Sequence, residues 1–149
     1  DVVGRRFQEV FSQLFGGGTA QIVLTDPDNI LTGGIDFYIQ PPGKKCQQLT
    51  LLSGGERALT VIALLFSFLD YRPAPFCVLD EVDAALDEAN VERFSSYLNR
   101  INKETQFIVV SHRKKTMEAA EVLQGVTMVE RGVSRLLTVA FEDVKEDLA

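Results

Sequence analysis

Two short apolar runs that end in polar side chains constrain the fold of this chain more than any other feature. Residues 76–79 lead into two acids at 80–81, and residues 106–110, apolar after the first, lead into a serine and a histidine at 111–112. Between the runs, apolar residues recur at helical spacing over 91–101. Strand, helix and strand in this order predict parallel strands joined by a right-handed crossover. Such sheets bind ligands beyond the carboxyl ends of their strands, where these polar residues are expected.

The remaining pattern predicts one α/β domain over residues 1–149. We expect a mainly parallel sheet flanked by helices, with a β-hairpin near the C-terminus. The helix expected at 58–69 is apolar nearly all round, which predicts burial on most of its sides. The other expected elements are a helix at 1–15 ended by the glycines at 16–18, strands at 20–24 and 35–40, a helix at 116–123, and hairpin strands at 126–130 and 134–139.

Composition and charge exclude several classes of protein. With 149 residues, 46% of them apolar and 24% charged, the chain has the composition of one globular domain. Its net charge of −6 argues against a surface that coats nucleic acid. Two isolated cysteines do not form a disulfide framework, so we expect a reducing, cytoplasmic setting. We see no signal peptide, and the apolar stretch 58–69 is shorter than the roughly 20 residues that span a bilayer, so no membrane partner is expected.

Asp80 and Glu81 are the first candidates for a functional site. A carboxylate at the end of a buried strand can hold Mg²⁺, often through water, because Mg²⁺ keeps much of its hydration shell. The next carboxylate, if it points into the same cleft, can orient or deprotonate an attacking water. The alternative is a strand that simply ends in surface acids, and the pair alone does not decide between the two.

The segment Ser53-Gly54-Gly55-Glu56 precedes the apolar helix and has two interpretations. Serine followed three residues later by glutamate is a capping box, which satisfies free backbone N–H groups at a helix start. A capping box does not need two glycines, which cost entropy in a first helical turn. Paired glycines are expected where the backbone approaches a ligand, and the N–H groups of a helix start bind anions such as phosphate.

Three further segments each have a structural and a functional interpretation. His112, the only histidine, follows a predicted strand and is either structural or a donor to a phosphoryl group. Asp87 lies between the acidic pair and the amphipathic helix, where capping that helix is the simpler role. The basic residues 113–115 are interpreted as the solvated start of a helix rather than as a nucleic-acid site.

A phosphate-binding loop with a lysine is missing from this sequence. No segment matches G-x-x-x-x-G-K-[ST]. Gly43-Lys44-Lys45 fails the pattern because Tyr38 stands at the first glycine position and Lys45 at the hydroxyl position. The chain therefore has a candidate metal and water end of a nucleotide site without the loop that cradles the phosphates.

Four segments together resemble the C-terminal lobe of an ATP-binding-cassette ATPase. Residues 52–57 (LSGGER) resemble the signature motif, and residues 76–81 (FCVLDE) resemble Walker B with its catalytic glutamate. Residues 83–87 (DAALD) resemble the D-loop, and His112 resembles the switch histidine. Each motif alone is weak, whereas four in this order and spacing are specific.

Nearly the whole chain is also similar to bacterial SMC (structural maintenance of chromosomes) proteins. The similar segments are FGGG at 15–18, QPPGKK at 40–45, DEVDAALDEANV at 80–91, SHRKKTME at 111–118 and GVTM at 125–128. In this family the Walker A lysine lies in an N-terminal lobe, and a long coiled coil with a hinge separates the two lobes in sequence. The resemblance therefore implies that the chain is the C-terminal half of an ATPase head and that residues 1–15 end the coiled coil.

The resemblance implies a mechanism and partners as well. ATP and Mg²⁺ would bind with Asp80 at the metal, Glu81 orienting a water and His112 at the γ-phosphate. A second head would close over the nucleotide, so this chain alone would be inactive. The cofactor-binding residues of the signature motif and D-loop would be Ser53, Gly54, Gly55, Glu56 and Asp87. The implied partners are the N-terminal lobe, a second head, a kleisin subunit and DNA, for chromosome condensation and segregation at the nucleoid.

Three other functions compete with this one. A DNA recombination or repair ATPase of the same long-coiled-coil type is the nearest alternative. A transporter subunit usually has glutamine where Glu56 stands and proline where Val82 stands, so both positions disfavour it. A scaffold that has lost its activity is disfavoured because Ser53, Asp80, Glu81 and His112 are all retained.

Overall fold

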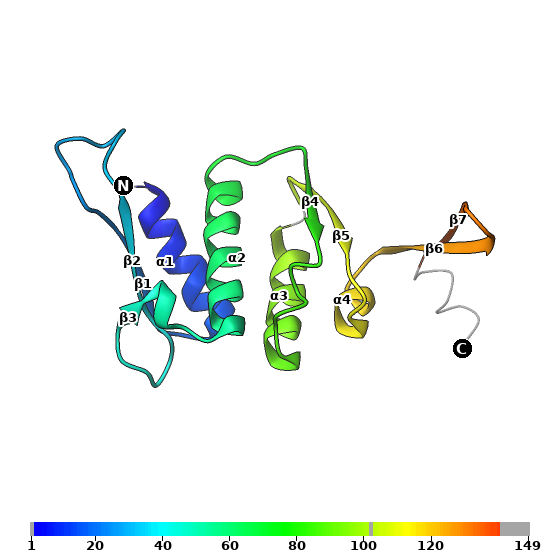
Figure 1. Cartoon of the computed structure of the whole chain (residues 1–149), viewed down its shortest axis with the longest axis horizontal. Helices are drawn as coiled ribbons and strands as arrows, with labels where there is room; N and C mark the ends of the chain where they lie inside the picture. The colour runs from blue at the N-terminus through cyan, green and yellow to red at the C-terminus, as the bar shows by residue number, and fades with distance from the viewer. Residues whose placement is uncertain (1, 102, 141–149) are drawn as a thin grey trace.

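The computed structural model describes residues 2–101 and 103–140, so residue 1 and the C-terminal end of the expected 1–149 domain lie outside the described residues. Helices and small sheets follow one another along the long axis of the molecule (Figure 1). The elements are α1 (Val2–Phe15), β1 (Thr19–Leu24), β2 (Ile35–Gln40), β3 (Gln47–Gln48), the 3₁₀ turn η1 (Leu49–Leu51), α2 (Gly54–Tyr71), β4 (Phe76–Asp80), α3 (Glu88–Ile101), β5 (Gln106–Val110), α4 (Lys114–Glu118), β6 (Val122–Glu130) and β7 (Val133–Ala140).

The first part of the chain folds α1 against an antiparallel sheet of order β1-β2-β3. The apolar stripe of α1 is buried, with Phe7, Phe11 and Leu14 each 0% exposed. The three glycines that end α1 all have positive φ, which side-chain-bearing residues rarely adopt. At Gly18 a Cβ atom would lie 2.4 Å from the carbonyl oxygen of Gln40, so this position needs glycine to let α1 turn directly into β1.

Helix α2 packs on α1 and α3 but is less enclosed than its composition predicts. One face enters the core, where Phe66 stacks on Phe94 of α3 with ring centroids 6.1 Å apart. The opposite face stays open, with Val61 53% and Phe68 50% exposed. The prediction of burial on most sides is therefore wrong for this chain, because among the described residues no element covers that face.

The α/β class is confirmed, and β4 and β5 pair in parallel with Asp80 opposite Val110. Leu79 points into the core, whereas the alternate residues of both strands face outward and are about half exposed: Phe76, Val78, Ile108 and Val110. Among the described strands the parallel part of the structure is this one pair, which is smaller than a mainly parallel sheet. The other pairings are antiparallel, because β1, β2 and β3 follow one another through loops and β6 and β7 form a hairpin.

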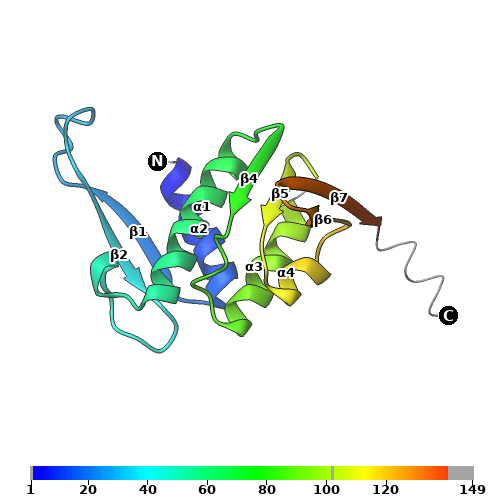
Figure 2. The same ribbon diagram turned by 45° about the vertical axis from the view of Figure 1, so that its right-hand side comes forward.

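The predicted C-terminal hairpin is present as β6 and β7, at the end of the molecule opposite the β1–β2 hairpin (Figures 1 and 2). The helix expected at 116–123 is shorter and earlier, because α4 ends at Glu118 and β6 begins at Val122. None of the described helices is long and apolar enough to cross a membrane.

Candidate functional site

The carboxyl ends of β4 and β5 lie side by side and bring the two candidate loops together. Glu81 follows β4 directly, and its backbone N–H donates to the carbonyl oxygen of Val110 at 2.9 Å. Glu81 has a φ of 50°, and it is the one non-glycine residue with positive φ among the described residues. A left-handed conformation strains a side-chain-bearing residue and persists only where the surroundings hold it. The chain thus turns at Glu81, directly after β4.

Glu81 and His112 face each other across the gap between the two loops. His112 Nδ1 lies 3.9 Å from Glu81 Oε1, and the side chains are 67% and 63% exposed. This separation is too long for a direct hydrogen bond. Both polar groups are therefore free to contact one small ligand in front of the strand ends.

Asp80, the last residue of β4, is exposed and has no side-chain hydrogen bond or ion pair to another described residue. Within residues 2–101 and 103–140, no three histidine, cysteine, aspartate or glutamate side chains gather as a ready metal site. A lone carboxylate nevertheless fits Mg²⁺, which commonly uses one or two carboxylates and takes its other ligands from water and phosphate. Asp80 can hold such an ion only if the remaining ligands come from outside the described residues.

The capping box at the start of α2 is confirmed. The hydroxyl of Ser53 donates to Glu56 Oε2 at 2.8 Å, and the backbone N–H of Ser53 donates to the same oxygen at 3.2 Å. Lys44 reaches in from the loop after β2, with Nζ 2.8 Å from Glu56 Oε1. The Lys44 ammonium is the main reason that the pKa of Glu56 lies below its ordinary value, with the bonds from Ser53 adding to it. Glu56 is thus held as a paired carboxylate.

The two glycines of this segment have different surroundings. A Cβ atom at Gly54 would meet nothing within 4 Å, whereas at Gly55 it would lie 3.1 Å from the carbonyl oxygen of Ala85. Gly55 therefore packs tightly against the loop after β4, and a larger residue there would press on that loop, a constraint within the chain that the sequence interpretation did not include. Gly54 remains open to an approaching ligand.

Asp87 caps α3, as the simpler interpretation predicts. Its Oδ1 accepts the backbone N–H of Asn90 at 2.8 Å. Among the described residues, the predicted site residues thus form three groups: Asp80, Glu81 and His112 at the strand ends, residues 53–56 at the start of α2, and Asp87 at the start of α3. Gly55 is the one that also touches the loop after β4, through Ala85.

Sequence reasoning missed a buried polar network around Asp83, two residues after Glu81. Asp83 is 0% exposed and accepts hydrogen bonds from the hydroxyls of Ser111 and Thr116, both at 2.5 Å. Arg113 donates from Nη2 to the carbonyl oxygens of Ala84 and Leu86, at 3.0 and 2.9 Å. The interpretation of 113–115 as a solvated helix start is therefore wrong for Arg113, whose Nε is buried. The one available signal in the sequence was the run of hydroxyl and basic residues that follows β5.

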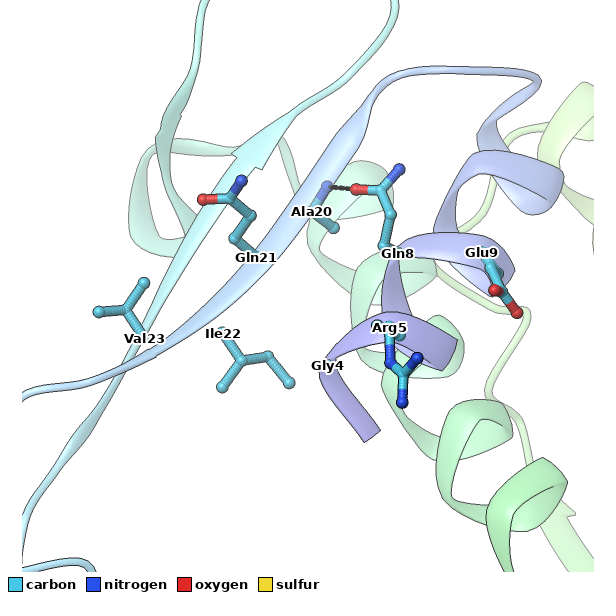
Figure 3. Close-up of a pocket in the computed structure, with 8 residues that line it drawn as sticks. All are labelled: Gly4, Arg5, Gln8, Glu9, Ala20, Gln21, Ile22 and Val23. Carbon is cyan, nitrogen blue, oxygen red and sulfur yellow. Dashed lines mark hydrogen bonds between the residues drawn. The ribbon is translucent and has the colours of Figure 1, made fainter. Parts of the chain in front are cut away.

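A groove of about 590 Å³ lies elsewhere, between α1 and β1 (Figure 3). Gln8 Oε1 accepts the backbone N–H of Ala20 there at 2.7 Å, which ties α1 to the edge of β1. None of the eight residues drawn around this groove belongs to the groups described above. The groove is therefore separate from the candidate site.

With this fold and these loops, the chain belongs to the RecF/RecN/SMC N-terminal domain family, whose pattern matches residues 26–135. It is 63% identical over 140 residues to the chromosome partition protein Smc of Bacillus subtilis (strain 168), a match that covers 94% of this chain and 12% of that protein. The chain therefore corresponds to a small part of the length of this relative.

Solved structures of SMC heads have the same fold. A structure from work on ATP-driven dimerisation and DNA-stimulated activation of SMC ATPases is 37% identical with a TM-score of 0.87, covering 99% of this chain and 89% of that one. The Smc head of Pyrococcus furiosus bound to the C-terminal domain of ScpA is 37% identical with a TM-score of 0.89, covering 99% of this chain and 37% of that one. The fold of this chain is thus that of SMC ATPase heads.

Proposed function

We propose that the chain is the C-terminal half of an SMC-type ATPase head, which hydrolyses ATP only together with an N-terminal lobe and a second head. The observation that carries this proposal is the pair Glu81 and His112, which face each other 3.9 Å apart at the carboxyl ends of parallel strands. A carboxylate and an imidazole at this edge of a sheet suit an attack by water on a phosphoryl group.

The open apolar faces support the need for an N-terminal lobe. Val61 and Phe68 of α2, together with the outer residues of β4 and β5, expose apolar surface that a complete domain buries. The sequence also has no lysine-bearing phosphate loop. We assign both functions, covering these faces and cradling the phosphates, to the N-terminal lobe. In this proposal residues 1–149 form one lobe, and residues 1–15 end the coiled coil.

Bound ATP would supply the phosphoryl group, and the positive charge of Mg²⁺ would draw electrons from that group. Asp80 would hold the metal through water, because its carboxylate is exposed at the strand end and has no described partner. Glu81 would orient and deprotonate the attacking water, and the exposed imidazole of His112 would donate to the γ-phosphate.

A second head would complete the site from the other side. The capping box uses the N–H groups of Ser53 and Glu56, and the open surroundings of Gly54 between them suit a γ-phosphate held by an opposing head. In the proposed role the opposing surface consists of Ser53, Gly54, Gly55, Glu56 and Asp87. ATP-driven dimerisation in work on the similar SMC ATPases supports this arrangement.

The wider role follows from the relatives. The similar Smc of Bacillus subtilis is a chromosome partition protein, and the similar head from Pyrococcus furiosus binds ScpA. We therefore propose a kleisin subunit and DNA as partners of the whole complex, in chromosome condensation and segregation at the nucleoid within the cytoplasm. This relative favours chromosome partition over the alternative of a recombination or repair ATPase.

Replacement of Glu81 by glutamine tests the proposal in a complete head, assembled from this chain and an N-terminal lobe. Glu81→Gln should slow hydrolysis by roughly 10²–10⁴-fold, because the amide cannot take a proton from water. ATP affinity should stay nearly unchanged, and ATP-bound dimers should accumulate. Turnover and ATP affinity are measured on the same preparation.

Glu92→Gln is the matched control, since Glu92 is exposed on α3 and lines a hollow with Gln13 and Tyr97 rather than with residues of the candidate site. It should leave turnover and affinity unchanged. Unchanged hydrolysis in Glu81→Gln would reject the proposed function, and a loss of ATP affinity instead would make Glu81 a ligand of the metal.

A further inference from the structure

The buried carboxylate of Asp83 has no role in the proposed reaction, yet it is the most enclosed charged side chain near the candidate site. It is 0% exposed, its Oδ2 accepts hydrogen bonds from two hydroxyls at 2.5 Å, and its Oδ1 has no partner among the described residues. Hydrogen bonds from hydroxyls to a carboxylate are short and strong. Asp83 therefore fixes the position of whatever carries those hydroxyls.

The two hydroxyls come from the segment after β5, which also carries His112. Ser111 immediately precedes His112, and Thr116 lies in α4. The Ser111 oxygen also accepts the backbone N–H of Arg113 at 2.9 Å, so its single hydrogen is directed to Asp83. These two bonds hold Ser111 and Arg113, the residues immediately before and after His112.

Arg113 adds a second connection between the same two loops. Its Nη2 donates to the carbonyl oxygens of Ala84 and Leu86, which flank the turn after Asp83. The backbone bond from Glu81 to Val110 is a third connection. The loop that carries Glu81 and the loop that carries His112 are thus joined at three points around Asp83.

The start of α2 also contacts this assembly. Gly55 packs so closely on Ala85 that a Cβ atom would lie 3.1 Å from the carbonyl oxygen. The loop after β4 therefore lies between the capped start of α2 and the histidine loop. Any displacement of this loop would move Glu81 relative to both.

We propose that Asp83 is a positioning residue that holds the Glu81 loop and the His112 loop as one rigid unit. The strained backbone of Glu81, with a φ of 50°, requires such support to keep its carboxylate opposite the imidazole. The inference rests on the proposed ATPase function and adds to it the group that sets the geometry of the reacting pair.

Variants of the hydroxyl donors separate positioning from plain stability in the complete head. Ser111→Ala and Thr116→Val each remove one hydrogen bond to Asp83, so both should lower the melting temperature. Ser111→Ala acts next to His112 and should lower turnover by roughly 10- to 100-fold with little change in ATP affinity. Thr116→Val should lower turnover less, and Ser111→Thr, which keeps the hydroxyl, should restore it.

The double variant with Glu81→Gln gives the decisive comparison by single-turnover hydrolysis. If Ser111 acts through the position of Glu81 and His112, Ser111→Ala should have little further effect once Glu81 is glutamine, although it still lowers the melting temperature. Two results would overturn the positioning role. In one, the turnover of Ser111→Ala and Thr116→Val falls only in proportion to their loss of melting temperature. In the other, Ser111→Ala lowers turnover by the same factor in the Glu81→Gln head as in the unaltered head. If Glu81→Gln alone has no effect, the ATPase function itself fails, which distinguishes the two results.

Discussion

Glu81 shows how much a single residue in this site depends on its neighbours. A left-handed backbone conformation costs about 1–3 kcal/mol for a side-chain-bearing residue. The bond from its N–H to Val110 and the bonds around Asp83 offset that cost locally. The exposed carboxylate of Glu81 is thus held in place by buried hydrogen bonds around Asp83.

Ser53 has a structural role that is confirmed and a proposed role in closing two heads. Ser53→Arg in the complete head should lower stability by roughly 0.5–2 kcal/mol, because the cap of α2 is lost. It should also abolish ATP-dependent dimerisation, since a bulky side chain would stand where the opposing nucleotide must enter. Melting temperature, ATP affinity and dimer formation on one preparation check this.

Ser53→Ala is the matched control, because it removes the cap without adding bulk. It should lose similar stability yet keep more dimerisation than the arginine variant. Equal dimerisation by both variants and the unaltered head would leave Ser53 with its capping role alone.

Helix α2 combines two surfaces that composition cannot tell apart. Phe66 is 0% exposed and packs on Phe94 and Tyr97 of α3. Phe68, two residues later, is 50% exposed on the other face. Both are apolar and lie in the same helix, so only the three-dimensional packing distinguishes a core residue from an interface residue.

Substitutions on the two faces of α2 should therefore change different properties: assembly with the lobe on one face, and stability of the chain on the other. Phe68→Ser should leave the melting temperature of the isolated chain nearly unchanged but weaken its assembly with the N-terminal lobe. Phe66→Ala should cost about 3–5 kcal/mol, because it opens a cavity in the core. Thermal unfolding of the isolated chain and co-purification with the lobe measure the two effects. Normal assembly by Phe68→Ser would remove this face from the proposed interface.

At the scale of the whole molecule, the chain has a candidate catalytic pair, and in our proposal the N-terminal lobe supplies the parts that cradle the nucleotide. The sequence has no lysine-bearing phosphate loop, and residues 2–101 and 103–140 hold no group of three metal-ligating side chains. The purified chain should therefore show no ATP turnover above background, whereas addition of the N-terminal lobe should restore it. Phosphate release from the chain with and without the lobe checks this. Steady turnover by the chain alone, abolished by Glu81→Gln, would contradict the proposed split site.

Patterns between near neighbours were sufficient to predict much of this protein. The capping box at Ser53 depends on residues three positions apart, and the hairpin of β6 and β7 on two strand segments that flank Arg131-Gly132. The meeting of Glu81 and His112 was also accessible, because parallel strands end at the same edge of a sheet. Each of these features follows from local spacing or from one topological rule.

The burial of Asp83 and the openness of α2 depended on contacts that local spacing does not encode. Thr116 donates to Asp83 across 33 positions, and nothing in either segment marks the pair. The apolar residues of α2 indicate that its faces avoid water but not which element covers them. Long-range packing settles both questions, because burial depends on where distant parts of the chain, or a partner, come to lie.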